Sequence, residues 1–154
     1  MTNKDITHEQ LVKGLQEDLA REYKAIIQYV VYSQVINEPQ YMTIAEELEK
    51  HAHEELDHAL RIAKQLDYFG VYPSTTPAKV ETSEDNRKML EFDLKGEDDT
   101  VANYRERIIQ ANALGEFALA EELQEIIRQE QEHQIDLASA LGIVADPRQR
   151  KGIK

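Results

Sequence analysis

The chain has 154 residues, of which 41% are hydrophobic, and its 30 acidic against 18 basic residues give a net charge of −12. A chain of this length is typical of one domain with its own core, and no apolar run approaches the roughly 18 to 20 residues that a membrane span needs. The acidic balance disfavours nucleic acid and anionic membranes as partners, and the lack of cysteine excludes disulfides and thiolate metal ligands.

The N-terminal half predicts two long helices. Its first ten residues, MTNKDITHEQ, contain no apolar segment like the core of a secretory signal, so we expect a cytoplasmic protein. Thr7 and Gln10 form a capping-box pattern, which predicts a helix that ends at about Asn37, before Pro39. A second helix is expected over about 41–69.

The C-terminal half predicts a second pair of helices after an irregular connection. Segment 71–81, VYPSTTPAKVE, contains two prolines and is expected to cross from one helical pair to the other. Thr82 or Ser83 can cap a third helix that runs to about residue 113, and a fourth is expected over 116–141. Three of the four helices are expected to stop at glycines: Gly70, Gly115 and Gly142.

The connections define the fold class that we expect. Short, long and short links between helices of roughly 25 to 30 residues suit an all-α four-helix bundle, in which a long crossover joins two helical hairpins. We assign residues 1–142 to this domain. Residues 143–154 are a short basic tail, which either contacts nucleic acid or stays a solvated terminus. Its basic residues are Arg148, Arg150, Lys151 and Lys154.

Two segments of the chain carry the same four polar residues at the same offsets. In both, a Glu is followed by a Tyr at +7 and by a Glu-x-x-His pair at +33 to +36. The members are Glu22, Tyr29, Glu55 and His58 in the first segment, and Glu97, Tyr104, Glu130 and His133 in the second. If each half is a hairpin and the hairpins pack face to face, four carboxylates and two imidazoles converge.

Helical periodicity places these side chains on inward faces. In the first helix the inward positions are Leu11, Leu15, Leu19, Glu22, Ile26, Tyr29 and Ser33, so a carboxylate interrupts an apolar stripe. The other three helices show the same pattern. Burying a lone carboxylate costs several kcal/mol unless a cation or a partner compensates. Six such groups at matched depth therefore predict a metal site.

The ligand types favour a pair of iron ions. Carboxylates can be terminal ligands of one ion or bridge two ions, and each imidazole adds a neutral ligand. Because the two side chains of Glu-x-x-His lie one turn apart, one helix can supply both to one ion. Two lone Glu plus two Glu-x-x-His is the set found in ferritin-like di-iron and di-manganese proteins. We expect two iron ions per chain, with manganese or zinc able to replace them. The predicted ligands are Glu22, Glu55, His58, Glu97, Glu130 and His133.

Four further side chains are candidates for roles beside the metals. Tyr29 and Tyr104 either pack in the core with a satisfied hydroxyl or act next to the metals, through hydrogen bonds or one-electron chemistry. We include Tyr29 among the catalytic candidates. Asp93 could hold the far nitrogen of a ligand histidine. His51 is expected to be a core or supporting group and not a third imidazole ligand.

The chain resembles the ferritin-like superfamily and, within it, the bacterioferritins. The resemblance covers about 8–141 and is carried by EYKAIIQY at 22–29, ELDH at 55–58, EDDTVANYRE at 97–106 and EQEH at 130–133. It implies that the six predicted ligands form a ferroxidase centre, with Glu55 and Glu130 as bridges between the irons. Tyr29 and Asp93 match residues that those proteins keep near the site.

The chain also departs from the bacterioferritin pattern. Leu56 stands where a methionine would ligate haem, so we do not expect haem. The fifth helix typical of a 24-subunit cage is not expected, which leaves a homo-oligomer that is either a dimer or a cage, such as a 12-subunit shell. Ile62 and Asp136 replace a tyrosine and a tryptophan that accompany the ligand histidines.

The resemblance and the site together predict a ferroxidase that oxidises Fe(II) to Fe(III) with O2 or H2O2, for iron storage or detoxification. The alternative is a di-iron or di-manganese oxidase or peroxidase, of rubrerythrin or oxygenase type, that acts on a substrate and stores no iron. A rubrerythrin route normally uses a cysteine-bearing rubredoxin-like domain, and this chain has no cysteine. A helical binding module with structural metals is the third interpretation.

Overall fold

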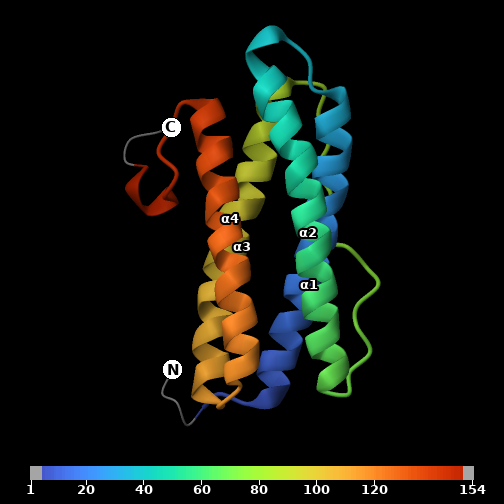
Figure 1. Ribbon diagram of the computed structural model, residues 1–154, viewed down its shortest axis with the longest axis vertical. Coiled ribbons are helices and arrows are strands. Elements are labelled where there is room, and N and C mark those ends of the chain that lie inside the picture. Colours follow the sequence, from blue (N-terminus) through green and yellow to red (C-terminus); the bar gives the residue numbers. More distant parts are fainter. Residues whose placement is uncertain (1–4, 151–154) are drawn as a thin grey trace.

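The computed structural model describes residues 5–150 as four long helices and two short 3-10 helices (Figure 1). In chain order they are α1 (His8–Val35), η1 (Pro39–Tyr41), α2 (Met42–Tyr68), α3 (Asn86–Ala113), α4 (Phe117–Leu141) and η2 (Pro147–Gln149). The described part of the chain contains no strand. None of its helices is long and apolar enough to cross a membrane.

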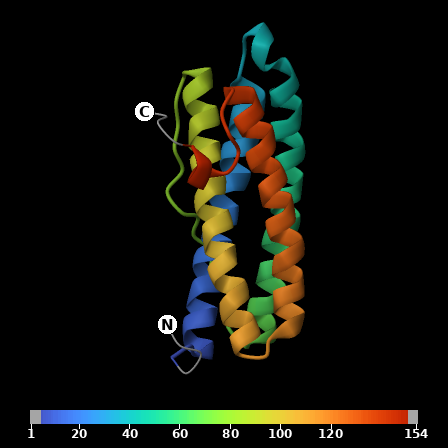
Figure 2. The same ribbon diagram turned by 90° about the vertical axis from the view of Figure 1, so that its left-hand side faces the viewer.

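The helices form a bundle of two antiparallel hairpins, α1 with α2 and α3 with α4. The hairpins pack against each other through α1 with α3 and α2 with α4. The crossover after α2 climbs the outside of the bundle to reach the start of α3, which Figures 1 and 2 show from two sides. The predicted all-α bundle with one long crossover is therefore confirmed.

Hydrogen bonds to α1 hold the crossover against the bundle. The Ala78 amide donates to the Ala20 carbonyl at 2.9 Å, and the Glu81 amide donates to the Gln28 side chain at 2.9 Å. The buried Tyr32 hydroxyl donates to the Glu81 carbonyl. The first helix thus turns Tyr32 inward, while Ser33, the position that we expected there, is half-buried. The long connection is fixed because its backbone polar groups find partners on α1.

Two predicted helix starts had different outcomes. The capping box at α1 is confirmed, since the Thr7 hydroxyl accepts from the Gln10 amide and the Gln10 side chain accepts from the Thr7 amide. The predicted cap of α3 is wrong, because Asp85 caps that helix by accepting from the Lys88 amide at 3.0 Å. Ser83 lies outside the helix and accepts from the Asp85 amide. The three predicted stops are confirmed by the positive φ of Gly70, Gly115 and Gly142.

Two apolar clusters fill the bundle, one on each side of a polar layer. One cluster contains Leu15, Leu19, Leu66 and Leu123, and the other contains Leu48, Leu90 and Leu137. Each of the four helices contributes side chains to both clusters and to the layer between them. The polar layer is therefore enclosed at both ends by close-packed hydrocarbon.

The basic tail is partly docked onto the bundle. The Arg150 guanidinium pairs with Asp98 of α3 at 2.6 Å and donates to the Val144 and Ala145 carbonyls, so it is not a solvated group. Arg148 pairs with Asp146. Lys151 and Lys154 lie outside the described residues, and the division of the chain at residue 142 stays a prediction.

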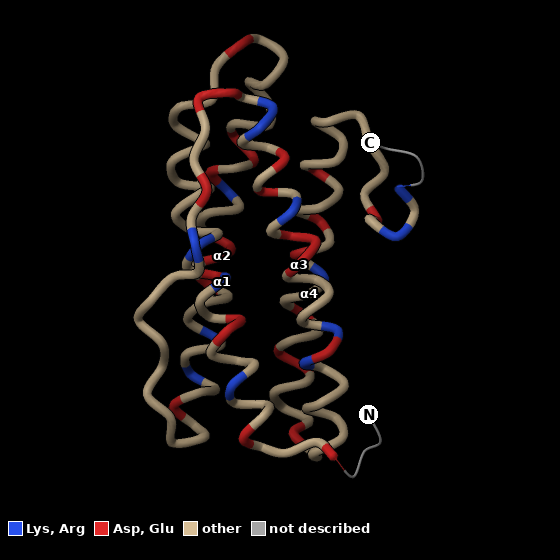
Figure 3. The backbone as a smooth tube through the Cα atoms, turned by 180° about the vertical axis from the view of Figure 1, so that it is seen from behind, with Lys and Arg blue, Asp and Glu red and all other residues tan. Residues whose placement is uncertain are grey.

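Figure 3 shows that acidic residues are spread over all four helices.

Candidate metal centre

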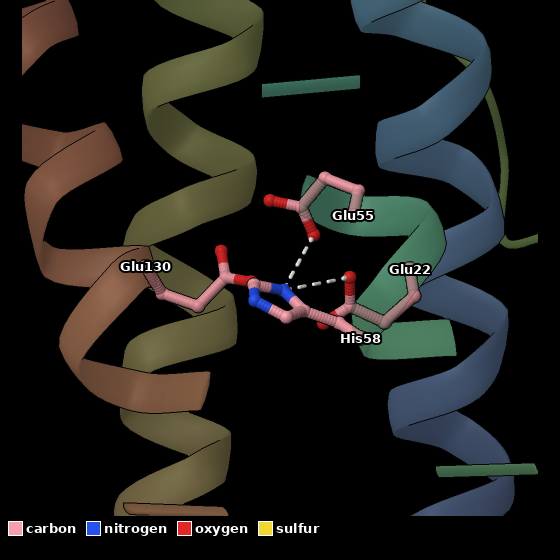
Figure 4. Close-up of side chains that lie close together, drawn as sticks. All are labelled: Glu22, Glu55, His58 and Glu130. Carbon is pink, nitrogen blue, oxygen red and sulfur yellow. Dashed lines mark hydrogen bonds and ion pairs between the residues drawn. The ribbon is translucent and has the colours of Figure 1, made fainter. Parts of the chain in front are cut away.

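All six predicted ligands meet in the polar layer at the middle of the bundle. Glu22 comes from α1, Glu97 from α3, and the two Glu-x-x-His pairs come from α2 and α4. Each of the six side chains belongs to a residue that is at most 2% exposed. Figure 4 shows Glu22, Glu55 and Glu130 directed toward the His58 ring. Helical phase alone brings these groups inward, because each lies on the apolar stripe of its helix.

Three carboxylates surround His58. Its Nδ1 lies 2.6 Å from Glu130 Oε1, 3.4 Å from Glu55 Oε2 and 3.7 Å from Glu22 Oε2. One ligand atom from each of these four residues can be chosen so that all lie within 4.8 Å of one another. They form one half of the candidate centre.

A matching set surrounds His133. Its Nδ1 lies 2.8 Å from Glu55 Oε1, 3.5 Å from Glu97 Oε1 and 3.6 Å from Glu130 Oε2. Glu55 and Glu130 belong to both sets. Each of these two carboxylates presents one oxygen to His58 and the other to His133, which is the orientation of a ligand that bridges two ions.

The buried polar atoms of the centre are short of hydrogen bonds. Both oxygens of Glu130, one oxygen each of Glu22, Glu55 and Glu97, and both ring nitrogens of His133 are buried and have no hydrogen-bond partner among the described residues. Several of these atoms lie close to one another, but the angles between them do not fit hydrogen bonds. Buried polar groups are nearly always paired, so this convergence of lone pairs fits bound cations. Carboxylate oxygen with imidazole nitrogen suits iron, manganese or zinc.

Without a cation the layer retains protons. Burial, with the nearby Glu130 and Glu22, raises the pKa of Glu55 well above its ordinary value. Burial and Glu130 raise the pKa of Glu97 from 4.5 to about 7. Burial and Glu22 also favour a higher pKa for Glu130, but its contacts with Glu97, His133 and His58 outweigh these effects and lower its pKa to about 2. A metal ion therefore has to displace protons as it binds.

A tyrosine from each half supports a carboxylate of the other half. The Tyr29 hydroxyl donates to Glu97 Oε1 at 2.6 Å, and the Tyr104 hydroxyl donates to Glu22 Oε1. Burial raises the pKa of both tyrosines, so each hydroxyl keeps its proton for this bond. Both tyrosines are buried in the core, and each hydroxyl is hydrogen-bonded to a predicted ligand. Core packing and support of the ligands by hydrogen bonds therefore occur together.

The far nitrogens of the histidines face residues that the sequence did not single out. His58 Nε2 lies 2.5 Å from Gln129 Oε1, and His133 Nε2 lies 3.6 Å from Glu54 Oε2. The prediction that Asp93 holds such a nitrogen is wrong, since both nitrogens face other residues and Asp93 Oδ1 accepts from Gln28 at 3.0 Å. A signal did exist, because a polar acceptor directly precedes the Glu of both Glu-x-x-His pairs.

His51 supports the centre from one side. Its ring stacks on the His133 ring with a centroid separation of 3.9 Å, and its Nε2 lies 3.0 Å from Asp136 Oδ2. Its ring also meets the edge of Tyr29. The polar partner of His51 is Asp136 and not one of the four central carboxylates, in agreement with the expectation of a supporting group.

A buried ion pair lies below the layer and was also missed. Arg107 Nε donates to Asp18 Oδ2 at 2.8 Å, and Arg107 Nη1 donates to Gln110 at 2.7 Å. Asp18 precedes Glu22 by four residues and Arg107 follows Tyr104 by three, so both lie one turn from the centre. Their inward spacing could have revealed them.

A narrow hollow lies between α1 and α3, and the predicted ligand Glu97 is among the residues that line it. Tyr29, Asp93 and Glu97 line its inner part, and Arg21 and Lys24 are among the residues that line the rest. Its volume is about 30 Å³, which suits molecules about the size of water.

Known proteins are similar to this chain in sequence and in architecture. The family model described as "Ferritin-like domain" matches residues 12–145. The bacterioferritin of Brucella melitensis biotype 1 is 26% identical over 139 residues, which is 86% of either chain.

Two solved structures are similar over most of the chain. A ferritin-like diiron-carboxylate protein from Bacillus anthracis str. Ames is 33% identical, with a TM-score of 0.83 over 88% of this chain and 99% of its own. The bacterioferritin of Rhodobacter capsulatus, solved with a metal-free dinuclear site and haem iron, is 25% identical, with a TM-score of 0.75 over 89% and 90%.

Proposed function

Because the chain belongs to the ferritin-like domain family, we propose that it is a ferroxidase, which oxidises Fe(II) to Fe(III) with O2 or H2O2 for iron storage or detoxification. The observation that carries this proposal is the position of Glu55 and Glu130, each with one oxygen near His58 and the other near His133. Two shared carboxylates support two ions side by side, as a two-electron reaction needs.

The charge of the site fits the substrate better than the product. Four carboxylates around two neutral imidazoles balance two Fe(II) ions, so binding leaves little uncompensated charge in a buried layer. Oxidation to two Fe(III) adds two positive charges there. The site must then take up anions derived from the oxidant or release the product, which favours a centre that iron passes through.

The oxidant completes the electron balance. Two Fe(II) ions give one electron each, and O2 takes both electrons with two protons to become H2O2. The hollow of about 30 Å³ beside Tyr29 and Glu97 has room for a molecule as small as O2 or H2O2. Tyr29 and Tyr104 orient the terminal carboxylates through their hydrogen bonds.

We also propose that the protein assembles as a homo-oligomer. Large apolar side chains are exposed on the α1–α2 face, and an apolar hollow lies between these helices. The exposed members are Ile27, Val30, Val31, Val35, Leu56 and Leu60. A surface of this kind is typical of a protein interface. Leu56 has no metal-ligating atom, so haem remains outside the proposal.

Rapid mixing of metal-free protein with Fe(II) and O2 tests the proposal. We expect about two irons per chain to be oxidised quickly, and Glu55→Ala or His133→Ala to abolish this phase while circular dichroism still shows a helical protein. Glu46→Ala, an exposed change on the same helix as Glu55, is the matched control. A fast phase of normal size in both ligand variants contradicts the assignment.

The amount of iron that stays soluble with the protein then separates storage from catalysis. Retention far beyond two irons per chain supports storage in an assembly. Fast oxidation that stops at about two per chain supports the oxidase or peroxidase instead.

A further inference from the structure

A third group of potential ligands lies beside the dinuclear centre. Glu47 and His51 from α2 and Asp136 from α4 can each offer one atom so that all three atoms lie within 4.8 Å of one another. His51 is 1% exposed, and its Nε2 faces Asp136, while its Nδ1, on the other side of the ring, is buried with no hydrogen-bond partner in the described part of the chain. The group therefore combines a buried imidazole with two carboxylates, a donor set that transition-metal ions accept.

The geometry of the group suits a small divalent cation. His51 Nε2 and Asp136 Oδ2 are 3.0 Å apart. Two ligands at right angles on an ion, each with a bond of about 2.1 Å, are separated by about 3.0 Å. Glu47 precedes His51 by one helical turn and so points along the same face.

The group is open to solvent on one side. The side chains of Glu47 and Asp136 are 34% and 39% exposed. A surface hollow of about 310 Å³ opens onto both, with Gln40, Thr43 and Ser139 in its wall. A hydrated ion can therefore reach the two carboxylates before it meets the buried imidazole.

One cation already competes for this position. The Lys50 ammonium lies 2.9 Å from Glu47 Oε1, and the Lys50 side chain is 66% exposed. A mobile surface pair of this kind contributes little stability. Lys50 can swing into solvent when a divalent ion arrives.

We propose that Glu47, His51 and Asp136 form a third site that binds a divalent cation such as Fe(II), separate from the two-ion centre. Its imidazole stacks on the His133 ring, so the site adjoins the centre on the side where the α2–α4 seam meets solvent. One face of α2 then carries a row of potential ligands that runs from the surface to the core: Glu47, His51, Glu55 and His58. The third site lies at the surface end of this row.

Cobalt counting by equilibrium dialysis tests the proposal on the metal-free full chain. Co(II) is the probe because O2 oxidises it less readily than Fe(II). We expect about three Co(II) per chain in the wild type and about two in Glu47→Gln and in Asp136→Asn. Glu46→Gln, an exposed neighbour on the same helix, should bind as the wild type does. Lys50→Gln should tighten binding of the third ion.

Removing the pair of ions separates this proposal from the ferroxidase proposal. In Glu130→Ala the two central ions should be lost while about one Co(II) stays, and a further Glu47→Gln change should remove it. Equal cobalt counts in the wild type, Glu47→Gln and Asp136→Asn overturn the third site. Counts that respond to Glu47→Gln but not to Glu130→Ala overturn the central pair and leave the third site standing.

Discussion

Glu97→Gln is expected to stabilise the metal-free protein and to weaken its metal-bound form. Burial and Glu130 raise the pKa of Glu97 from 4.5 to about 7. That rise of about 2.5 pKa units, at 1.36 kcal/mol each, means that the ionised carboxylate costs about 3 kcal/mol of folding free energy. Glutamine has nearly the same shape, carries no charge and can still accept the Tyr29 hydrogen bond.

The sign of the pH dependence follows from proton linkage. The folded protein holds the Glu97 proton more tightly than the unfolded chain, so this stabilisation is fully present below pH 4.5 and is lost as the pH rises through 7. The advantage of Glu97→Gln should therefore be under about 1 kcal/mol at pH 5 and about 3 kcal/mol at pH 8. At pH 8 this corresponds to a melting temperature roughly 6 to 12 °C higher.

Thermal and denaturant unfolding, followed by circular dichroism with a chelator present, measures this difference. Adding Zn(II) should then stabilise the wild type more than the variant, because the variant has lost a ligand. Glu106→Gln, an exposed change on the same helix, should show neither effect. A metal-free Glu97→Gln protein that is less stable than the wild type at pH 8, or a difference that does not vary with pH, would refute the reasoning.

Three further predictions test other parts of the structure. Because metal must displace the Glu97 proton below pH 7, and Glu55 also holds its proton, chelator competition should show Zn(II) affinity falling at least about tenfold per pH unit there; a flat profile between pH 5 and 7 would contradict this. In Gly14→Ala the new Cβ would lie 2.2 Å from the Arg107 guanidinium, so denaturant unfolding should show a loss of about 1–3 kcal/mol, whereas Gly96→Ala, which meets nothing within 4 Å, should be neutral or stabilising. Removing the acceptor on the far side of a ligand histidine by Gln129→Ala should lower Zn(II) affinity about 10–100-fold, and unchanged affinity would show that this contact is dispensable.

Local patterns were sufficient for the helices and for the central residues. Helical phase depends only on neighbouring positions, so a carboxylate or histidine on an apolar stripe, such as Glu22 or His133, can be recognised as inward from the sequence. The repeat of the same offsets in both halves then indicated that the six groups meet. Gly70, Gly115 and Gly142 ended helices as expected because the left-handed backbone there favours glycine.

Details at helix ends and on helix flanks were decided by packing. Tyr32 and Ser33 are both close to the inward face of α1, and the contact of Tyr32 with the crossover selects it. Asp85 caps α3 although Thr82 and Ser83 have suitable side chains, and the Ser83 hydroxyl accepts from the Asp85 amide, which lies outside the helix. Several positions satisfy the local rule equally well at such places, so tertiary contacts choose among them.

The sequence by itself determined the four helices, the crossover and the inward set of two carboxylates and two Glu-x-x-His pairs, because each of these rests on spacing within a single helix. Only the tertiary structure decided which groups touch across helices. It paired His58 with Gln129, joined Asp18 to Arg107 and brought Asp136 of α4 against His51 of α2. These contacts depend on how far each helix is rotated and shifted along its neighbour, and close packing of the whole core sets that register.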